Sequence, residues 1–255
     1  MTDPKDTDNS GKDSDNDRNH NIHRFPDKRE RTQRIRDKKQ ALKDLEKHQK
    51  KIQHEPILKL PDVTRILLYS IILIHIALLF VADDLKQMII YQFSIVPARY
   101  NFSEVPLTWQ ALVTPLTHLF FHGSWLHLGL NSATLVAFGA GLEKALGPKR
   151  MLIFFTACGV LGAFAHIVVY FGSPAPMLGA SGAISGLFAG LLLILKAKGA
   201  IPYRILPLIL IWVGISVLFG IFGAPGVDSN IAWVTHLGGF FAGLLLLKPI
   251  LRLKP

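Results

Sequence analysis

A serine and a histidine, each near the head of a glycine-faced apolar run, are the residues best suited to chemistry. Ser181 stands in the sequence GASG, at the start of an apolar run that ends at Leu195. His236 lies in a second apolar run, residues 231–247, and is followed by glycines at 239 and 243. Glycines four apart share one helix face, which lets two helices approach closely in lipid. Because imidazole can take the proton of a serine hydroxyl, the pair predicts a Ser-His dyad.

A polar stretch supplies candidate oxyanion donors. Residues 117–131 read THLFFHGSWLHLGLN, in which His127 and Asn131 are four apart and share a helix face. Polar side chains inside a membrane span are costly and usually functional, although an interhelical hydrogen bond would explain either one alone. Attack on a carbonyl creates an oxyanion, which His127, Asn131 and the backbone N–H of Ser181 are suited to stabilise. His118 and His122 are interpreted as interfacial histidines satisfied by water or backbone.

Helix rise predicts that these groups share one depth. At about 1.5 Å per residue, Ser181 stands roughly 22 Å above the basic end of its helix, and His236 roughly 18 Å. Asn131 and His127 stand roughly 20 and 25 Å above the basic end of theirs. In a hydrocarbon core near 30 Å thick, all four lie in the outer half.

Charge divides the chain into two parts. Residues 1–60 hold 16 of the 28 Lys and Arg and 12 of the 18 Asp and Glu, with little apolar material to bury. We predict a charged, disordered cytoplasmic tail over residues 1–60, with a loose basic helix in residues 28–51, and a membrane domain over residues 61–255. No secretory signal is recognised at the N-terminus. The single cysteine, Cys158, excludes an intrachain disulfide and a cysteine metal site.

Six apolar segments of roughly spanning length predict an all-α membrane protein. Basic residues cluster in the tail, in the second and fourth connections and at the C-terminus, so both termini are expected to be cytoplasmic. The long connection 83–123 is rich in aromatic residues and is expected to form short amphipathic helices in the outer leaflet. The predicted spans are residues 66–82, 124–142, 151–171, 181–195, 205–222 and 231–247.

No carboxylate is well placed to complete a triad behind His236. Glu143 and Asp62 are predicted at the opposite membrane face, whereas Asp83, Asp84 and Glu104 belong to the outer connection. Asp228 lies eight residues before His236, in the expected loop above it. The sequence therefore favours a dyad.

The three motifs together resemble the rhomboid family of intramembrane serine proteases, over roughly residue 64 to the C-terminus. The motifs are GASG, HGSWLHLGLN and the His-x-x-Gly-x-x-x-Gly pattern that begins at His236. The resemblance implies a six-helix fold with a water-filled site that opens outward. It also implies cleavage of peptide bonds in or near transmembrane segments of other membrane proteins.

The resemblance assigns roles residue by residue. It implies that Ser181 is the nucleophile and His236 the base, with His127 and Asn131 as oxyanion donors. His118 and His122 match histidines that help to hold water, and Glu143 matches a structural glutamate. Three positions differ from common family residues: Gln110 replaces an arginine after Trp109, Ser185 a tyrosine and Thr235 an alanine.

Three other functions remain as alternatives. A catalytically silent membrane-protein binding or escort factor is predicted to lack Ser181 or His236, and both are present. A metal enzyme using His118, His122 and His127 would need carboxylates at the same depth. A six-helix transporter would not require a serine and a histidine at matched depth. We expect no cofactor, no metal and no nucleic-acid partner. The expected partners are transmembrane protein substrates and the bilayer of a bacterial inner membrane.

Overall fold

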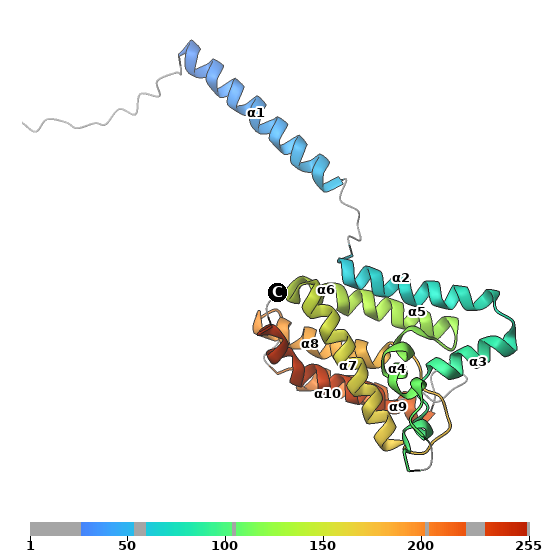
Figure 1. Cartoon of the computed structure of the whole chain (residues 1–255). Helices are drawn as coiled ribbons and strands as arrows, with labels where there is room; N and C mark the ends of the chain where they lie inside the picture. The colour runs from blue at the N-terminus through green and yellow to red at the C-terminus, as the bar shows by residue number, and fades with distance from the viewer. Residues whose placement is uncertain (1–26, 54–59, 104–105, 202–203, 223–232, 254–255) are drawn as a thin grey trace, which may run out of the picture. The chain divides into compact units, whose positions relative to one another are not determined.

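The computed structural model describes residues 27–53, 60–103, 106–201, 204–222 and 233–253. The chain divides into two units, residues 1–59 and 60–255. In the first unit the described residues form one charged helix, α1 (Lys28–Gln53) (Figure 1). We predicted a disordered tail over residues 1–60, and residues 1–26 and 54–59 of it lie outside the described ranges.

Within the described ranges of the second unit, every regular element is helical, which confirms the all-α prediction. Each predicted span falls on a helix or on a run of consecutive helical segments. The spans correspond to α2 (Asp62–Ala77) with η1 (Leu78–Phe80), to α5 (Trp125–Thr134) with η4 (Leu135–Gly139) and α6 (Ala140–Leu146), to α7 (Pro148–Val169), to α8 (Ser181–Ala197), to α9 (Leu206–Phe222) and to α10 (Trp233–Leu251).

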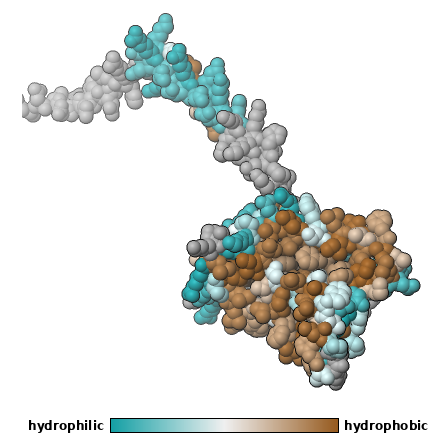
Figure 2. All heavy atoms as spheres, in the orientation of Figure 1, coloured by the Kyte–Doolittle hydropathy of each residue, from teal (hydrophilic) through white to brown (hydrophobic). Residues whose placement is uncertain are grey.

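Length and composition suit this unit to a membrane. In the described ranges, three helical stretches are long and apolar enough to cross a bilayer, namely 62–80, 148–169 and 233–251, and α8 and α9 contribute shorter apolar helices. Figure 2 shows that the visible face of the bundle is mostly hydrophobic, with hydrophilic residues gathered at its margins. Large apolar side chains such as Phe80, Phe164 and Leu245 are exposed. A surface of this kind is suited to contact with lipid rather than water.

α2 lies beside the α5–α6 segment and is capped by it (Figure 1). The buried Glu143 carboxylate accepts hydrogen bonds from the backbone N–H groups of Val63 and Thr64, at 2.9 and 2.8 Å, and from the Thr64 hydroxyl at 2.7 Å. The first N–H groups of a helix have no acceptor within the helix, and the Glu143 carboxylate supplies that acceptor for two of them. This explains why α2 begins four residues before the predicted span.

Glu143→Gln is expected to lower the thermal stability of the membrane unit. The amide leaves one acceptor oxygen for three donors and removes the negative charge from the helix N-terminus. Hydrogen bonds to a charged group contribute about 1.5–3 kcal/mol, so a loss of that order is expected. Thermal unfolding in detergent micelles measures it. Lys144→Gln, at the exposed neighbouring position, serves as the matched control. An equal melting temperature for the two variants would contradict the capping role.

The centre of the unit is a three-helix contact between α7, α8 and α10. Backbone meets backbone there because glycines remove the side chains. A Cβ at Gly162 of α7 would lie 2.8 Å from the Thr235 carbonyl oxygen of α10. A Cβ at Gly243 of α10 would lie 2.5 Å from the Gly186 carbonyl oxygen of α8. The small-residue faces predicted from the sequence therefore do meet.

The connection between α2 and α5 folds into short helices, as predicted. They are α3 (Asp83–Phe93), η2 (Pro97–Tyr100), α4 (Trp109–Thr117) and η3 (His118–Phe120). Arg99 ties the end of α3 by donating to the backbone carbonyls of Tyr91 and Ser94, at 3.0 and 3.3 Å. The Tyr100 hydroxyl bonds to the Ala111 carbonyl at 3.1 Å. The connection is therefore held by its own polar contacts.

Candidate active site

The loop that leads into Ser181 is held by backbone hydrogen bonds to the outer connection. Ile95 and Met177 form an isolated antiparallel bridge, with N–O distances of 2.9 and 2.7 Å. Nearer to the serine, the Gly179 N–H donates to the His118 carbonyl at 2.9 Å. Gly179 has φ of 120°, a conformation that glycine adopts readily and other residues do not. The loop therefore delivers Ser181 to the first position of α8 in a fixed place.

α10 lies against the first turn of α8, next to the serine. A Cβ at Gly182 would lie 2.5 Å from Thr235 Cγ2 and 3.2 Å from the Thr235 carbonyl oxygen. One turn further along α10, Gly239 contacts the carbonyl group of Gly182. Because Ser181 and His236 adjoin these contacts in sequence, they lie on facing turns, and both are half-buried.

His127 reaches the same place from α5. A Cβ added at Gly179 would lie 2.8 Å from both Cε1 and Nε2 of His127 and 3.9 Å from Ser181 Oγ. The His127 ring also interacts electrostatically with His236. Three helices therefore bring Ser181, His127 and His236 to one half-buried region.

Asn131 is buried one turn below His127. Its side-chain nitrogen donates to the His127 carbonyl at 3.0 Å, a bond within its own helix. An amide carries two N–H bonds, so one remains for a ligand. This geometry holds the side chain on the His127 face of α5.

His118 and His122 are both buried beside this region. His118 Nδ1 lies 2.8 Å from the Thr114 carbonyl oxygen. Burial lowers the pKa of His118 to about 4 and that of His122 to about 3, so both imidazoles are neutral at pH 7. The His122 ring centroid lies 5.0 Å from that of His127, edge to face.

Two further histidines join these rings, and sequence reasoning gave neither of them a role. His75 of α2 interacts electrostatically with His122 and His127. His166 of α7 interacts with His118 and lies with its ring centroid 4.6 Å from that of Tyr170. The only available signal was a histidine inside an apolar run, which does not reveal the neighbouring helix.

The three positions that differ from common family residues all have partners or close neighbours. Gln110 donates to the Gln92 side-chain oxygen at 2.8 Å, which ties α4 to α3. The Ser185 hydroxyl donates to the Ser181 carbonyl at 2.8 Å, within α8. The Thr235 methyl fills the space beside Gly182. None of the three displaces Ser181 from the start of α8.

The carboxylates weighed as a third triad member have other contacts, lie exposed at the start of α3 or fall outside the described residues. Glu143 caps α2, and Asp62 forms an ion pair with Arg65 at 2.7 Å. Glu104 and Asp228 belong to residues that the structure does not describe. In the ranges that are described, no three His, Cys, Asp or Glu side chains are grouped to hold a metal ion.

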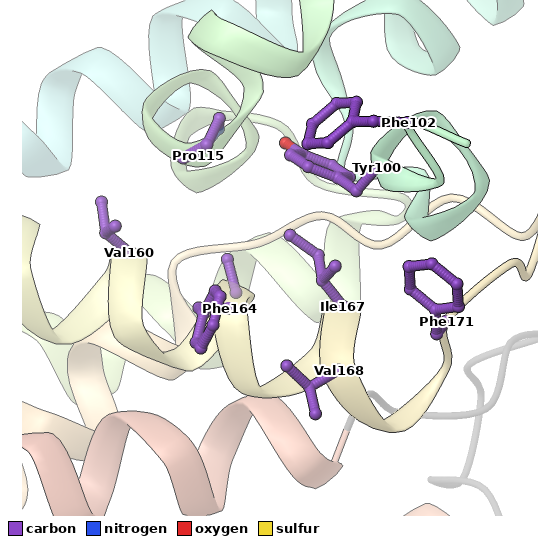
Figure 3. Close-up of a pocket in the computed structure, with 9 residues that line it drawn as sticks. Tyr100, Phe102, Pro115, Val160, Phe164, Ile167, Val168 and Phe171 are labelled. Carbon is purple, nitrogen blue, oxygen red and sulfur yellow. The ribbon is translucent and has the colours of Figure 1, made fainter. Parts of the chain in front are cut away.

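An apolar cavity of about 300 Å³ lies between the outer connection and α7 (Figure 3). Its walls are almost wholly hydrocarbon, and the Tyr100 hydroxyl bonds away to the Ala111 carbonyl. The cavity has no group suited to acid–base or nucleophilic chemistry, so the Ser181 region is the better candidate active site. The lining residues are Tyr100, Phe102, Pro115, Val160, Ala163, Phe164, Ile167, Val168 and Phe171.

Comparison with known proteins gives one consistent family. The Rhomboid domain matches residues 109–253. The protein YdcA of Bacillus subtilis is 31% identical over 150 residues, which cover 58% of this chain and 70% of YdcA. Rhomboid protease GluP of the same species is 32% identical over 142 residues, which cover 55% of this chain and 27% of GluP.

One relative carries a different description. Inactive RHOMBOID-like protein 8 of Arabidopsis thaliana is 30% identical over 161 residues, which cover 58% of this chain and 44% of that protein. The relatives thus include named proteases and a protein named as inactive, while the domain match is shared. The helical bundle, the apolar spans and these similarities together show that the chain belongs to the rhomboid family, whose general role is intramembrane proteolysis.

Proposed function

We propose that this protein is an intramembrane serine endopeptidase that acts through a Ser181–His236 dyad on transmembrane proteins. The observation that carries the proposal is the meeting of Ser181, His127 and His236 from α8, α5 and α10 in one half-buried region. The names of the relatives add to this support.

The roles follow from the chemistry of each group. His236 takes the Ser181 proton as the oxygen attacks the scissile carbonyl, and the carbonyl π electrons move to its oxygen. His127, Asn131 and the Ser181 N–H donate to that oxyanion. The proton then passes from His236 to the departing amine, which leaves an acyl-enzyme. Water, activated by the same histidine, releases the new carboxylate and restores the serine.

The proposed orientation places the basic end of the bundle in the cytoplasm. Arg150 Nε donates to the Leu253 carbonyl at 3.0 Å, which joins the second connection to the C-terminal segment. Glu143, at the start of the second connection, caps the first turn of α2. These three basic segments therefore meet at one end of the unit. By the positive-inside rule this end faces the cytoplasm, with both termini, and Ser181 opens outward. We propose a bacterial inner membrane as the location, with residues 1–60 as a cytoplasmic tail and 61–255 as the protease domain.

The test is cleavage of a model transmembrane substrate by the purified full chain in liposomes. We expect two product fragments, and we expect a serine-directed fluorophosphonate to stop the reaction and to label the protein. Binding of the substrate without cleavage would instead favour an escort function for this chain, and one of its relatives is itself named inactive.

The oxyanion roles predict a partial loss of rate. Removing one such donor typically lowers turnover by about 100- to 1000-fold, and two donors remain in Asn131→Ala or His127→Ala. The oxyanion exists only in the transition state, so kcat is expected to fall while KM changes little. Steady-state kinetics separate the two constants, and the fluorophosphonate should still label Asn131→Ala, more slowly. An increase in KM alone would make Asn131 a substrate contact.

A further inference from the structure

His75 has the properties of a functional side chain although it lies outside the proposed dyad. It is the one histidine in the run 66–82, in which Tyr69 and Ser70 are the other polar residues. An ionisable group in a span is costly and is kept where it has a task. Its ring is half-buried and packs edge-on against the Trp125 ring at 4.6 Å between centroids.

Buried nitrogen atoms without partners collect around His75. In the described part of the chain, His75 Nδ1 is buried without a hydrogen-bond partner, and the His122 ring has only a backbone contact with Phe120, too poorly aligned for a regular hydrogen bond. His75 interacts electrostatically with both His122 and His127, and the His122 and His127 rings meet at 5.0 Å and 66°. Buried polar atoms are nearly always satisfied, by protein or by ordered water with two to four polar partners. His75 Nδ1 and the His122 ring are therefore the polar atoms in this region that are suited to binding a bridging water molecule.

The task for such a group comes from the chemistry of His127. A neutral imidazole has one N–H donor and one acceptor nitrogen, and the partner of one nitrogen decides which of them carries the proton. The Nε2 edge of His127 faces Gly179 and Ser181. To donate to an oxyanion there, the neutral His127 ring must carry its proton on Nε2. Its Nδ1 is then unprotonated and must accept a hydrogen bond from a donor on the side of the ring that faces away from Ser181.

We propose that His75 is a positioning residue, which together with His122 and bridging water donates to His127 Nδ1 and so fixes the Nε2–H form of the oxyanion donor. The inference deepens the proposed function and rests on it. His75 does not touch the substrate. It acts through the ring of His127, in the way that outer partners orient imidazole ligands at metal sites.

Two substitutions separate polarity from packing. His75→Phe keeps an aromatic ring against Trp125 and removes both nitrogens, whereas His75→Gln keeps a donor and an acceptor. We expect His75→Phe to lower kcat on the order of 10- to 100-fold, as for other outer partners of imidazoles, with KM unchanged. We expect His75→Gln to restore most of the turnover. Tyr69→Phe, at an exposed position on the same helix, is the control for removing one polar group from α2 and should match the wild type.

A second readout does not depend on protease activity. In protein labelled with ¹⁵N-histidine and carrying Ser181→Ala, the ¹⁵N shifts of His127 report which nitrogen bears the proton, and the signal is assigned by its loss in His127→Gln. We expect the Nε2–H form in the parent and a mixture of both forms after His75→Phe. If Ser181-dependent cleavage is absent from the wild type, the proposed function fails, and this measurement alone decides the role of His75. Full turnover in His75→Phe, equal losses in the Phe and Gln variants, or an unchanged His127 signal would each overturn the inference.

Discussion

Ser181→Ala is expected to abolish cleavage of a transmembrane substrate without unfolding the protein. The hydroxyl is the proposed attacking group, and no other serine or threonine in the described ranges stands at the head of α8. Alanine fits the same space at the first turn of a helix and loses little. The measurements are substrate cleavage in liposomes and thermal unfolding in detergent. We expect no product above the uncatalysed background and a melting temperature close to that of the wild type.

The histidine offers a stricter check on the same assignment. His236→Ala should be as damaging as Ser181→Ala, because nucleophile and base act as a unit and their losses do not add. The double variant should therefore be no slower than either single one. Undiminished cleavage by Ser181→Ala would end the assignment of the nucleophile, and a much slower double variant would show that the two residues act separately.

The local sequence predicts the core of the fold well, because each span is a long apolar run and the described structure makes each one helical. The small faces of α8 and α10 were also predictable, since glycines four apart can only lie on one face. The pairing of α8 with α10 was predicted as well, but this reasoning did not identify α7 as the third helix of the contact. The contact of α7 with Thr235 depends on Gly162, a glycine without a regular repeat, and was missed.

The positions of the candidate site residues were predictable only in part, because local spacing shows which face a residue lies on but not which distant segment it meets. Ser181 and His236 stand on faces that the spacing identifies, whereas the relation of His127 to Gly179 depends on a loop held by the Ile95–Met177 bridge. No local pattern predicts that bridge. His75 is similar, because a single histidine on a helix gives no sign of the helix it will face.

Irregular backbone is the second feature that limits prediction of the contacts from the sequence. The predicted span 124–142 was treated as a regular helix, yet residues Leu135–Gly139 form a π-helical turn and the helix continues to Leu146. A π-turn shifts the faces of everything that follows it. Here Gly139 comes to lie against Thr64, and Glu143 reaches the start of α2. Counting at a fixed helical period could not place these contacts.

The second large effect is expected at Gly239, where α8 and α10, the helices that carry the proposed dyad, are closest. A Cβ at this position would meet the carbonyl group of Gly182, with the carbonyl carbon at 2.7 Å. Backbone cannot rotate away as a side chain can, so α8 and α10 must separate. Gly239→Ala is therefore expected to destabilise the protein by about 1–3 kcal/mol, as overpacked cores do. A shift of about 1 Å between reacting groups costs on the order of 100-fold in rate, so cleavage should fall by at least that factor.

A glycine without neighbours provides the matched control. No atom lies within 4 Å of a Cβ built at Gly214 of α9, among the residues that the structure describes. In a helix interior alanine is favoured over glycine by up to about 1 kcal/mol, so Gly214→Ala should keep or raise the melting temperature and keep the cleavage rate. The same chemical change is thus expected to act in opposite directions at the two positions. If Gly239→Ala behaves like Gly214→Ala, the separation of α8 and α10 is not set by this contact. The proximity of Ser181 and His236 would then need another cause.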